Sequence, residues 1–132
     1  MRVLLDTHAC LWALQGDSQL SATASRIITD PGNESLLSVA SLWEMAIKVR
    51  KGTLIVNTGA QPFAQTILRD LRAARIGLLD IAPNHALAVS ILPLSDHKDP
   101  FDRLIAAQAM IEGMPLVSRD TRLDQYGVQR IW

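Results

Sequence analysis

Residues 3–15 read VLLDTHACLWALQ, and this stretch indicates the fold class. Residues 3–5 form a short apolar run that ends at Asp6, which is typical of a buried strand. Residues 7–15 follow a helical spacing of apolar side chains, and Gly16 is a residue that commonly ends a helix. A buried strand that passes directly into a helix is the opening unit of an α/β protein.

The rest of the chain repeats this alternation. Strands are expected at 34–38, 78–81, 116–117 and 128–131, and helices at 21–30, 39–51, 61–75, 83–92, 99–112 and 121–125. Alternating strands and helices favour a parallel sheet with helices on both faces. No linker, repeat or low-complexity stretch interrupts the pattern, so we expect one α/β domain over residues 1–132.

The composition excludes several classes of protein. Of the 132 residues, 48% are hydrophobic and 20% are charged, which is enough apolar material for a core and argues against disorder. The formal net charge is zero, so any contact with nucleic acid must be local rather than spread over a basic surface. A single cysteine, Cys10, permits no internal disulfide, and neither a signal peptide nor a membrane span is visible, so we expect a cytoplasmic protein.

Four acidic residues occupy informative positions, each at the end of an expected strand or in the first turns of an expected helix. They are Asp6, Glu44, Asp102 and Asp120. In an open α/β sheet the carboxyl ends of the strands and the following helix N-termini share one rim, so distant acids can meet in one cleft. Each acid also has a structural explanation, since Asp caps helices and Ser41 with Glu44 has the spacing of a capping box.

Acids that meet in one cleft require a counter-charge. Two carboxylates about 4 Å apart repel each other by about 4 kcal/mol at an effective dielectric constant near 20. Either some of them stay protonated or a divalent cation neutralises them. The sequence has no Cys/His cluster for zinc, so oxygen ligands point to Mg²⁺ or Mn²⁺ and to phosphodiester hydrolysis.

Four segments, in this order and spacing, resemble a known family. They read LLDTH at 4–8, SLWE at 41–44, HKDPFDRLIAAQA at 97–109 and LVSRD at 116–120. Together they resemble the PIN-domain ribonucleases, and within them the VapC-type toxins of type II toxin–antitoxin systems. The segment at 97–109 is the most specific of the four.

The resemblance implies a three-layer α/β/α sandwich around a central parallel sheet. It also implies a Mg²⁺- or Mn²⁺-dependent endoribonuclease that acts on tRNA, rRNA or mRNA. The expected partners are a cognate VapB-like antitoxin and a second copy of the chain in a homodimer. The acidic set of the family corresponds to Asp6, Glu44, Asp102 and Asp120.

Roles for individual residues follow from this correspondence. Asp6 and Asp102 would bind the metal directly, while Glu44 and Asp120 would bind through water or orient the attacking water. Ser118 would support the cleft by hydrogen bonding. Arg103, Arg119 and Lys98 are candidates to position RNA phosphates, because the guanidinium fork binds phosphate at two points and lysine supplies a point charge.

Several neighbouring residues remain open. We expect His8 to be structural, Asp99 to cap the helix at Pro100, and Asp124 to lie on a solvated face, although each could join the site. The basic residues Lys48, Arg50 and Lys51 have the pattern of a solvated helix face.

Two other functions compete with this hypothesis. A phosphohydrolase with an aspartyl nucleophile also has an acid after its first strand, but it usually has a second Asp where this chain has His8. A non-enzymatic module is the second alternative. A receiver domain would have paired acids near the first strand, and a degenerate PIN domain would have lost acids that are all present here.

Overall fold

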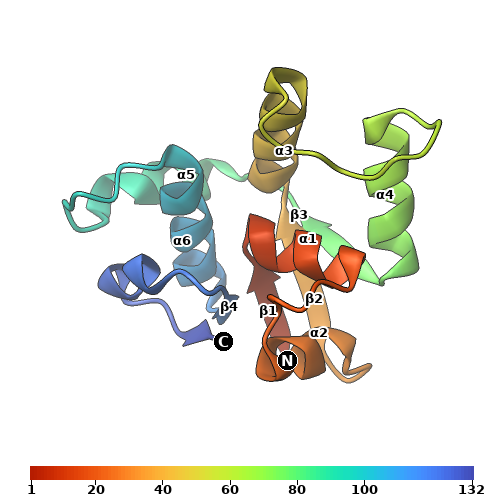
Figure 1. Ribbon diagram of the computed structural model, residues 1–132. Helices are drawn as coiled ribbons and strands as arrows, with labels where there is room; N and C mark the ends of the chain where they lie inside the picture. Colours follow the sequence, from red (N-terminus) through yellow and green to blue (C-terminus); the bar gives the residue numbers. More distant parts are fainter.

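The computed structural model describes residues 1–132 and contains one sheet of five parallel strands. In spatial order the strands are β3 (Ile76–Leu79), β2 (Glu34–Ser38), β1 (Arg2–Leu5), β4 (Leu116–Val117) and β5 (Arg130–Ile131). Leu4 of β1 lies opposite Leu36 of β2 on one side and Leu116 of β4 on the other. The expected α/β class with a parallel sheet is confirmed (Figure 1).

Helices connect the strands. They are α1 (Thr7–Gln15), α2 (Ala22–Thr29), α3 (Val39–Lys51), α4 (Phe63–Ala73), α5 (Pro83–Ala88), α6 (Pro100–Glu112) and the 3₁₀ helices η1 (Val89–Ile91) and η2 (Thr121–Tyr126). Figure 1 shows α4 to the right of β1, β2 and β3, and α5 and α6 to the left of these three strands. None of these helices combines the length and the hydropathy that crossing a membrane demands.

The strands divide their side chains between two hydrophobic cores. Leu5, Leu37 and Val117 pack with residues of α1, α2, α3 and α4. Leu4 and Leu36 point to the opposite face, where they pack with residues of α5, α6 and η2. Side chains of successive strand residues point to opposite faces, so continuous apolar runs such as residues 3–5 supply both cores at once.

The bounds of some expected elements are wrong. The strand expected at 78–81 is β3 at Ile76–Leu79, two residues earlier. Gly77 belongs to it because a β-carbon there would approach Leu36 Cδ2 to 2.9 Å, so the absent side chain permits close pairing with β2. The last strand covers only Arg130–Ile131 of the expected 128–131.

Two expected helices also differ in type. The helix expected at 83–92 ends at Ala88 and continues as the 3₁₀ turn η1, and the short helix expected at 121–125 is the 3₁₀ helix η2. Short helical segments gain little from the α-helical ladder, which makes the tighter form common in them.

All strands run in the same direction, so their carboxyl ends lie at one edge of the sheet. Asp6 directly follows β1, Ser38 ends β2, and Ser118 directly follows β4. The first turns of α1 and α3 begin at this edge, and their N-caps are Asp6 and Ser38. The topology therefore places residues from three distant parts of the sequence on one rim.

Candidate metal centre

Asp6 joins the ends of β1 and β4. Its Oδ1 accepts a hydrogen bond of 2.7 Å from the Ala9 backbone N–H, and its Oδ2 accepts one from the Ser118 hydroxyl. The Ser118 oxygen in turn accepts a 3.0 Å bond from the backbone N–H of Asp120. Burial raises the pKa of the Asp6 carboxyl, although the bonds from Ser118 and Ala9 oppose this shift. Ser118 thus connects the Asp6 carboxylate to the backbone of Asp120.

Glu44 is buried in α3 and has partners for both oxygens. Its Oε1 accepts a 2.6 Å hydrogen bond from the Thr7 hydroxyl, and its Oε2 accepts a 2.7 Å bond from Lys48 Nζ. Thr7 Oγ1 also lies 2.9 Å from Ser41 Oγ. Because Ser38 is the N-cap of α3, the capping-box explanation for Ser41 and Glu44 is wrong.

The expectation that Lys48 lies on a solvated helix face is wrong, because Lys48 is paired with the buried Glu44. The hydrogen bond to Glu44 raises the pKa of Lys48, and the negative charges of Asp99 and Asp102 act in the same direction. Lys48 is therefore part of the electrostatics of this rim rather than of a solvated face. Arg50 and Lys51, by contrast, are exposed as expected.

Asp102 lies in the first turn of α6, and its Oδ2 lies 2.9 Å from His97 Nε2. Burial raises the pKa of the Asp102 carboxyl to about 6, and the charges of Asp99 and Glu44 add to this, while His97 opposes it. His97 is itself buried, and its Nδ1 has no hydrogen-bond partner. Asp99 caps α6 as expected, through bonds from the N–H groups of Phe101 and Asp102.

Asp120 caps η2 and is held by Arg122. Its Oδ1 accepts the Arg122 backbone N–H at 3.0 Å. The guanidinium binds both carboxylate oxygens, with Nε 3.0 Å from Oδ1 and Nη2 2.8 Å from Oδ2. These bonds from Arg122 lower the pKa of the Asp120 carboxyl.

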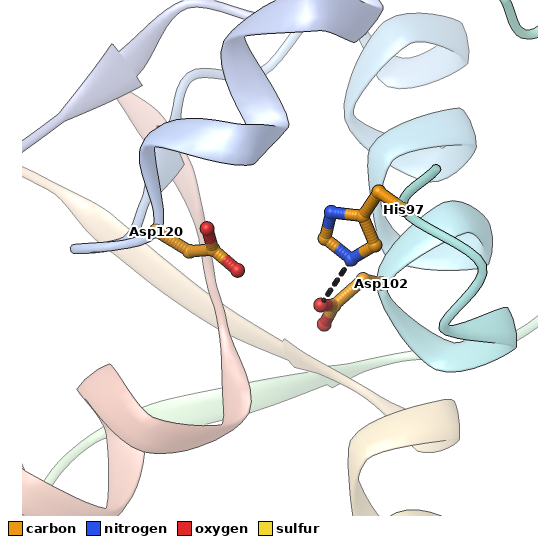
Figure 2. A group of neighbouring side chains, drawn as sticks. All are labelled: His97, Asp102 and Asp120. Atoms are coloured by element: carbon orange, nitrogen blue, oxygen red, sulfur yellow. Dashed lines mark hydrogen bonds and ion pairs between the residues drawn. The ribbon is translucent and has the colours of Figure 1, made fainter. Parts of the chain in front are cut away.

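The structure brings three of these side chains into one group. Ligand atoms of His97, Asp102 and Asp120 all lie within 4.8 Å of one another. Figure 2 shows Asp120 reaching from the start of η2 toward the hydrogen-bonded pair of His97 and Asp102. Two carboxylates at this separation can bind a cation between them, since both are acidic and only Asp120 has a guanidinium partner.

Asp6 and Glu44 lie beside this group but are not part of it. Asp6 lines a pocket of about 320 Å³ together with Asp120, and the rest of its lining is His8, Trp12, Arg119 and Arg122. Glu44 contributes to the raised pKa of Asp102 through its charge. The four expected acids therefore occupy one rim, and Asp102 and Asp120 are the two that converge.

The expected phosphate-binding residues have different surroundings. Arg119 lies 4.7 Å above the ring of Trp12 and lines the pocket of Asp6. The guanidinium of Arg103 lies 5.5 Å from the ring centre of Tyr126 and donates to the Pro93 carbonyl. Lys98 is exposed.

Asp124 lies outside the site, as expected. Its Oδ1 is 2.7 Å from Arg130 Nε, and its side chain is 53% exposed.

Two residues of the site were not assigned by sequence reasoning. His97 opens the most specific segment, five residues before Asp102, but a loop residue has no periodicity that would place it against a helix. Arg122 follows Asp120 by two residues, and this spacing beside an N-cap aspartate is the signal that could have identified their pairing.

Comparisons with known proteins extend this description. Residues 3–129 match the family described as PIN domain. Ribonuclease VapC22 of Mycobacterium tuberculosis is 31% identical over 121 residues, which cover 92% of this chain and 88% of the relative.

Solved structures share the fold. A chain of VapBC2 from Rickettsia felis, bound to a DNA fragment from its promoter, superposes with a TM-score of 0.68 and 17% identity, over 99% of this chain and 98% of that one. A chain of VapBC-1 from nontypeable Haemophilus influenzae gives a TM-score of 0.62 and 18% identity, over 99% and 97%. At these identities the likeness concerns the arrangement of strands and helices.

Proposed function

Because this chain belongs to the PIN-domain family and is related to VapC ribonucleases, we propose that it is a ribonuclease that requires Mg²⁺ or Mn²⁺. We further propose that it acts as the toxin of a type II toxin–antitoxin pair. The observation that carries the activity is the convergence of Asp102 and Asp120 with His97, beside the half-buried carboxylate of Asp6. The family membership disfavours the aspartyl phosphohydrolase and the receiver domain.

The residues present fit a hard divalent cation. Asp102 and Asp120 would hold it directly through carboxylate oxygens, the ligands that Mg²⁺ and Mn²⁺ prefer. Direct binding by Asp120 replaces the water-mediated role expected from the sequence, because its ligand atom lies within 4.8 Å of those of Asp102 and His97. Burial keeps the pKa of both Asp6 and Asp102 raised, which is the condition of carboxylates that lack a neutralising charge. Asp6 is near enough to Asp120 for their charges to interact, so it would complete the oxygen set.

A bound cation of this kind polarises a phosphate oxygen and lowers the pKa of a bound water. The residues of the chain prepare the site for it. His97 orients Asp102 through the 2.9 Å hydrogen bond, as outer partners of metal ligands do. Ser118 fixes Asp6 and the backbone of Asp120, and Glu44 is fixed by Thr7 and Lys48.

RNA would be held by a few local positive charges. Arg119 lines the same pocket as Asp6 and Asp120 and is oriented by Trp12, so it is placed to bind a phosphate next to the acids. Lys98 and Arg103 are proposed to bind phosphates farther from the reacting bond. This arrangement agrees with a chain whose formal net charge is zero.

A VapB-like antitoxin and a second copy of this chain are the proposed partners. Two structural neighbours support the antitoxin, because their names, VapBC2 and VapBC-1, pair a VapB with a VapC protein. Expression of this chain alone should slow bacterial growth, and co-expression of the cognate antitoxin should restore it. Growth at the normal rate without antitoxin would count against the toxin role.

The activity can be tested with two aspartate variants. Asp6→Asn and Asp102→Asn should each lower RNA cleavage more than about 100-fold, since even the outer partners of a metal site contribute about 10- to 100-fold. EDTA should stop cleavage by the wild type, and Mn²⁺ or Mg²⁺ should restore it.

Asp70→Asn is the matched control, because Asp70 lies on α4 and its partner is Arg69 rather than the acid group. This variant should cleave RNA at the wild-type rate. Undiminished cleavage by Asp102→Asn, or by the wild type in EDTA, would contradict the proposed mechanism.

A further inference from the structure

The Arg122 guanidinium is bound to Asp120, a carboxylate that is a ligand in the proposed metal site. The guanidinium binds both oxygens of Asp120, at 3.0 Å from Nε and 2.8 Å from Nη2. The same carboxylate supplies one of the three ligand atoms that lie within 4.8 Å of one another. The Asp120 carboxylate therefore has two competing uses: it pairs with the Arg122 guanidinium, and it is a ligand of the proposed metal site.

The two positive charges cannot both be near Asp120 without repelling each other. A divalent cation at the carboxylate would stand a few ångströms from the guanidinium, where like charges interact strongly. The ion pair that holds Arg122 has two-point geometry, but it lies in solvent because the Arg122 side chain is 67% exposed, and screening keeps the contribution of exposed pairs small. Arg122 is thus the partner that can leave.

Other arginines of the rim are held more firmly. Arg130 is 19% exposed and donates to the Ser118 carbonyl at 3.0 Å in addition to its pairing with Asp124. Arg119 lies over the ring of Trp12. All the side-chain hydrogen bonds of the Arg122 guanidinium go to Asp120, so losing that partner would free the whole group.

The position of Arg122 gives the released side chain a place to act. It lines the pocket of about 320 Å³ that contains Asp6 and Asp120. It also lines a second, open pocket of about 760 Å³ that contains His97 and the residues from Leu94 to Asp96. The Arg122 side chain therefore borders both hollows, one lined by Asp6 and Asp120 and the other by His97, within reach of a phosphate bound in either.

We propose that Arg122 changes partners when the site is loaded: it neutralises Asp120 in the metal-free protein and binds an RNA phosphate once Asp120 ligates a divalent cation. This inference rests on the proposed function, and it adds a residue that positions the substrate together with a coupling between metal binding and RNA binding. By reciprocity, RNA should bind more tightly to the metal-loaded protein.

The first test measures Mn²⁺ binding alone, by isothermal titration calorimetry without RNA. Arg122→Gln should bind Mn²⁺ about two- to fivefold more tightly than the wild type, since an exposed ion pair of this kind corresponds to up to about fivefold in affinity. Arg69→Gln is the matched control. Arg69 is 65% exposed and pairs with Asp70 on α4, so its replacement removes the same charge without touching the acid group.

The second test measures binding of a labelled single-stranded RNA 12-mer of mixed sequence by fluorescence anisotropy. Its phosphodiester links are replaced by phosphorothioates so that it resists hydrolysis, and the RNA is checked for integrity on a gel after each titration. With Mn²⁺ present, Arg122→Gln should bind the RNA more weakly, and the slope of log K against log salt concentration should fall by about 0.7, the loss of one phosphate contact. In EDTA the wild type and Arg122→Gln should have the same slope.

Three results would be decisive against the proposal. Equal Mn²⁺ affinity of Arg122→Gln and wild type would overturn the competition for Asp120. An unchanged salt slope with Mn²⁺, or a slope that differs already in EDTA, would overturn the change of partner. If the wild type neither binds Mn²⁺ nor cleaves RNA, the proposed function itself fails. A wild type that does both, but does not differ from Arg122→Gln, contradicts only the change of partner.

Discussion

Asp102 is the acidic residue of the site whose charge most clearly lowers the free energy of unfolding. Its carboxyl is only 23% exposed, and burial together with Asp99 raises its pKa from 3.8 to about 6. A carboxyl whose pKa is higher in the folded state stabilises the fold below the unfolded pKa, and that contribution is lost as the pH rises through about 6. The metal-free protein therefore carries an unfavourable charge at neutral pH.

We expect the metal-free Asp102→Asn variant to be more stable than the wild type at pH 7, by up to about 3 kcal/mol. The difference should shrink toward pH 4, where the wild-type carboxyl takes up its proton. Urea unfolding followed by circular dichroism in EDTA at both pH values measures this. A variant that is less stable than the wild type at pH 7 would show that His97 offsets the burial completely.

At the scale of elements, a hydrogen bond between the starts of two helices holds Glu44. The Thr7 hydroxyl, in the first turn of α1, donates to Glu44 of α3 at 2.6 Å, and both side chains are buried. Without this donor, one oxygen of a buried carboxylate has no partner.

Thr7→Val preserves the shape of the side chain and should lower the free energy of unfolding by about 1–3 kcal/mol, the cost of an unsatisfied buried group. It should also lower RNA cleavage, because Glu44 is no longer held in one orientation. Thr29→Val is the control and should have little effect, because Thr29 is exposed on α2 and its hydroxyl donates to the Ser25 carbonyl of the same helix. Equal stability of the two variants in urea titrations would argue that Glu44 does not need Thr7.

At the scale of the whole molecule, the site joins parts of the chain that are distant in sequence. Asp120 and Asp102 come from η2 and α6, and Asp6 follows β1. A ligand that binds the folded site and not the unfolded chain stabilises the fold in proportion to its saturation, by about 2.7 kcal/mol at 100 times its dissociation constant.

Mn²⁺ at such a concentration should raise the melting temperature of the wild type by several degrees, and EDTA should reverse the shift. Asp102→Asn should show a much smaller rise, whereas Asp70→Asn should respond like the wild type. Differential scanning fluorimetry measures all three proteins side by side. An equal rise in Asp102→Asn would place the cation somewhere other than at this rim.

Much of the fold could be predicted from local patterns in the chain. Asp6, Gly16, Ser21 and Gly52 stand at the ends of helices whose bounds were expected to within a residue, because caps and left-handed glycines are local requirements. The strand at Ile76–Leu79 was expected two residues late. Its Gly77 reads as a weak strand residue, and only the approach of Leu36 from β2 explains it.

The acidic residues themselves, their order and their place after strands are properties of the chain, because each depends on one strand–helix junction. Which of them meet is a matter of tertiary packing. Asp102 and Asp120 converge with His97, while Glu44 is bound by Thr7 and Lys48 and Asp120 is held by Arg122. Such partners come from the crossing of separate elements and from the rotamers they impose. No periodicity along the chain encodes them, so the three-dimensional arrangement alone decided which charges are neighbours.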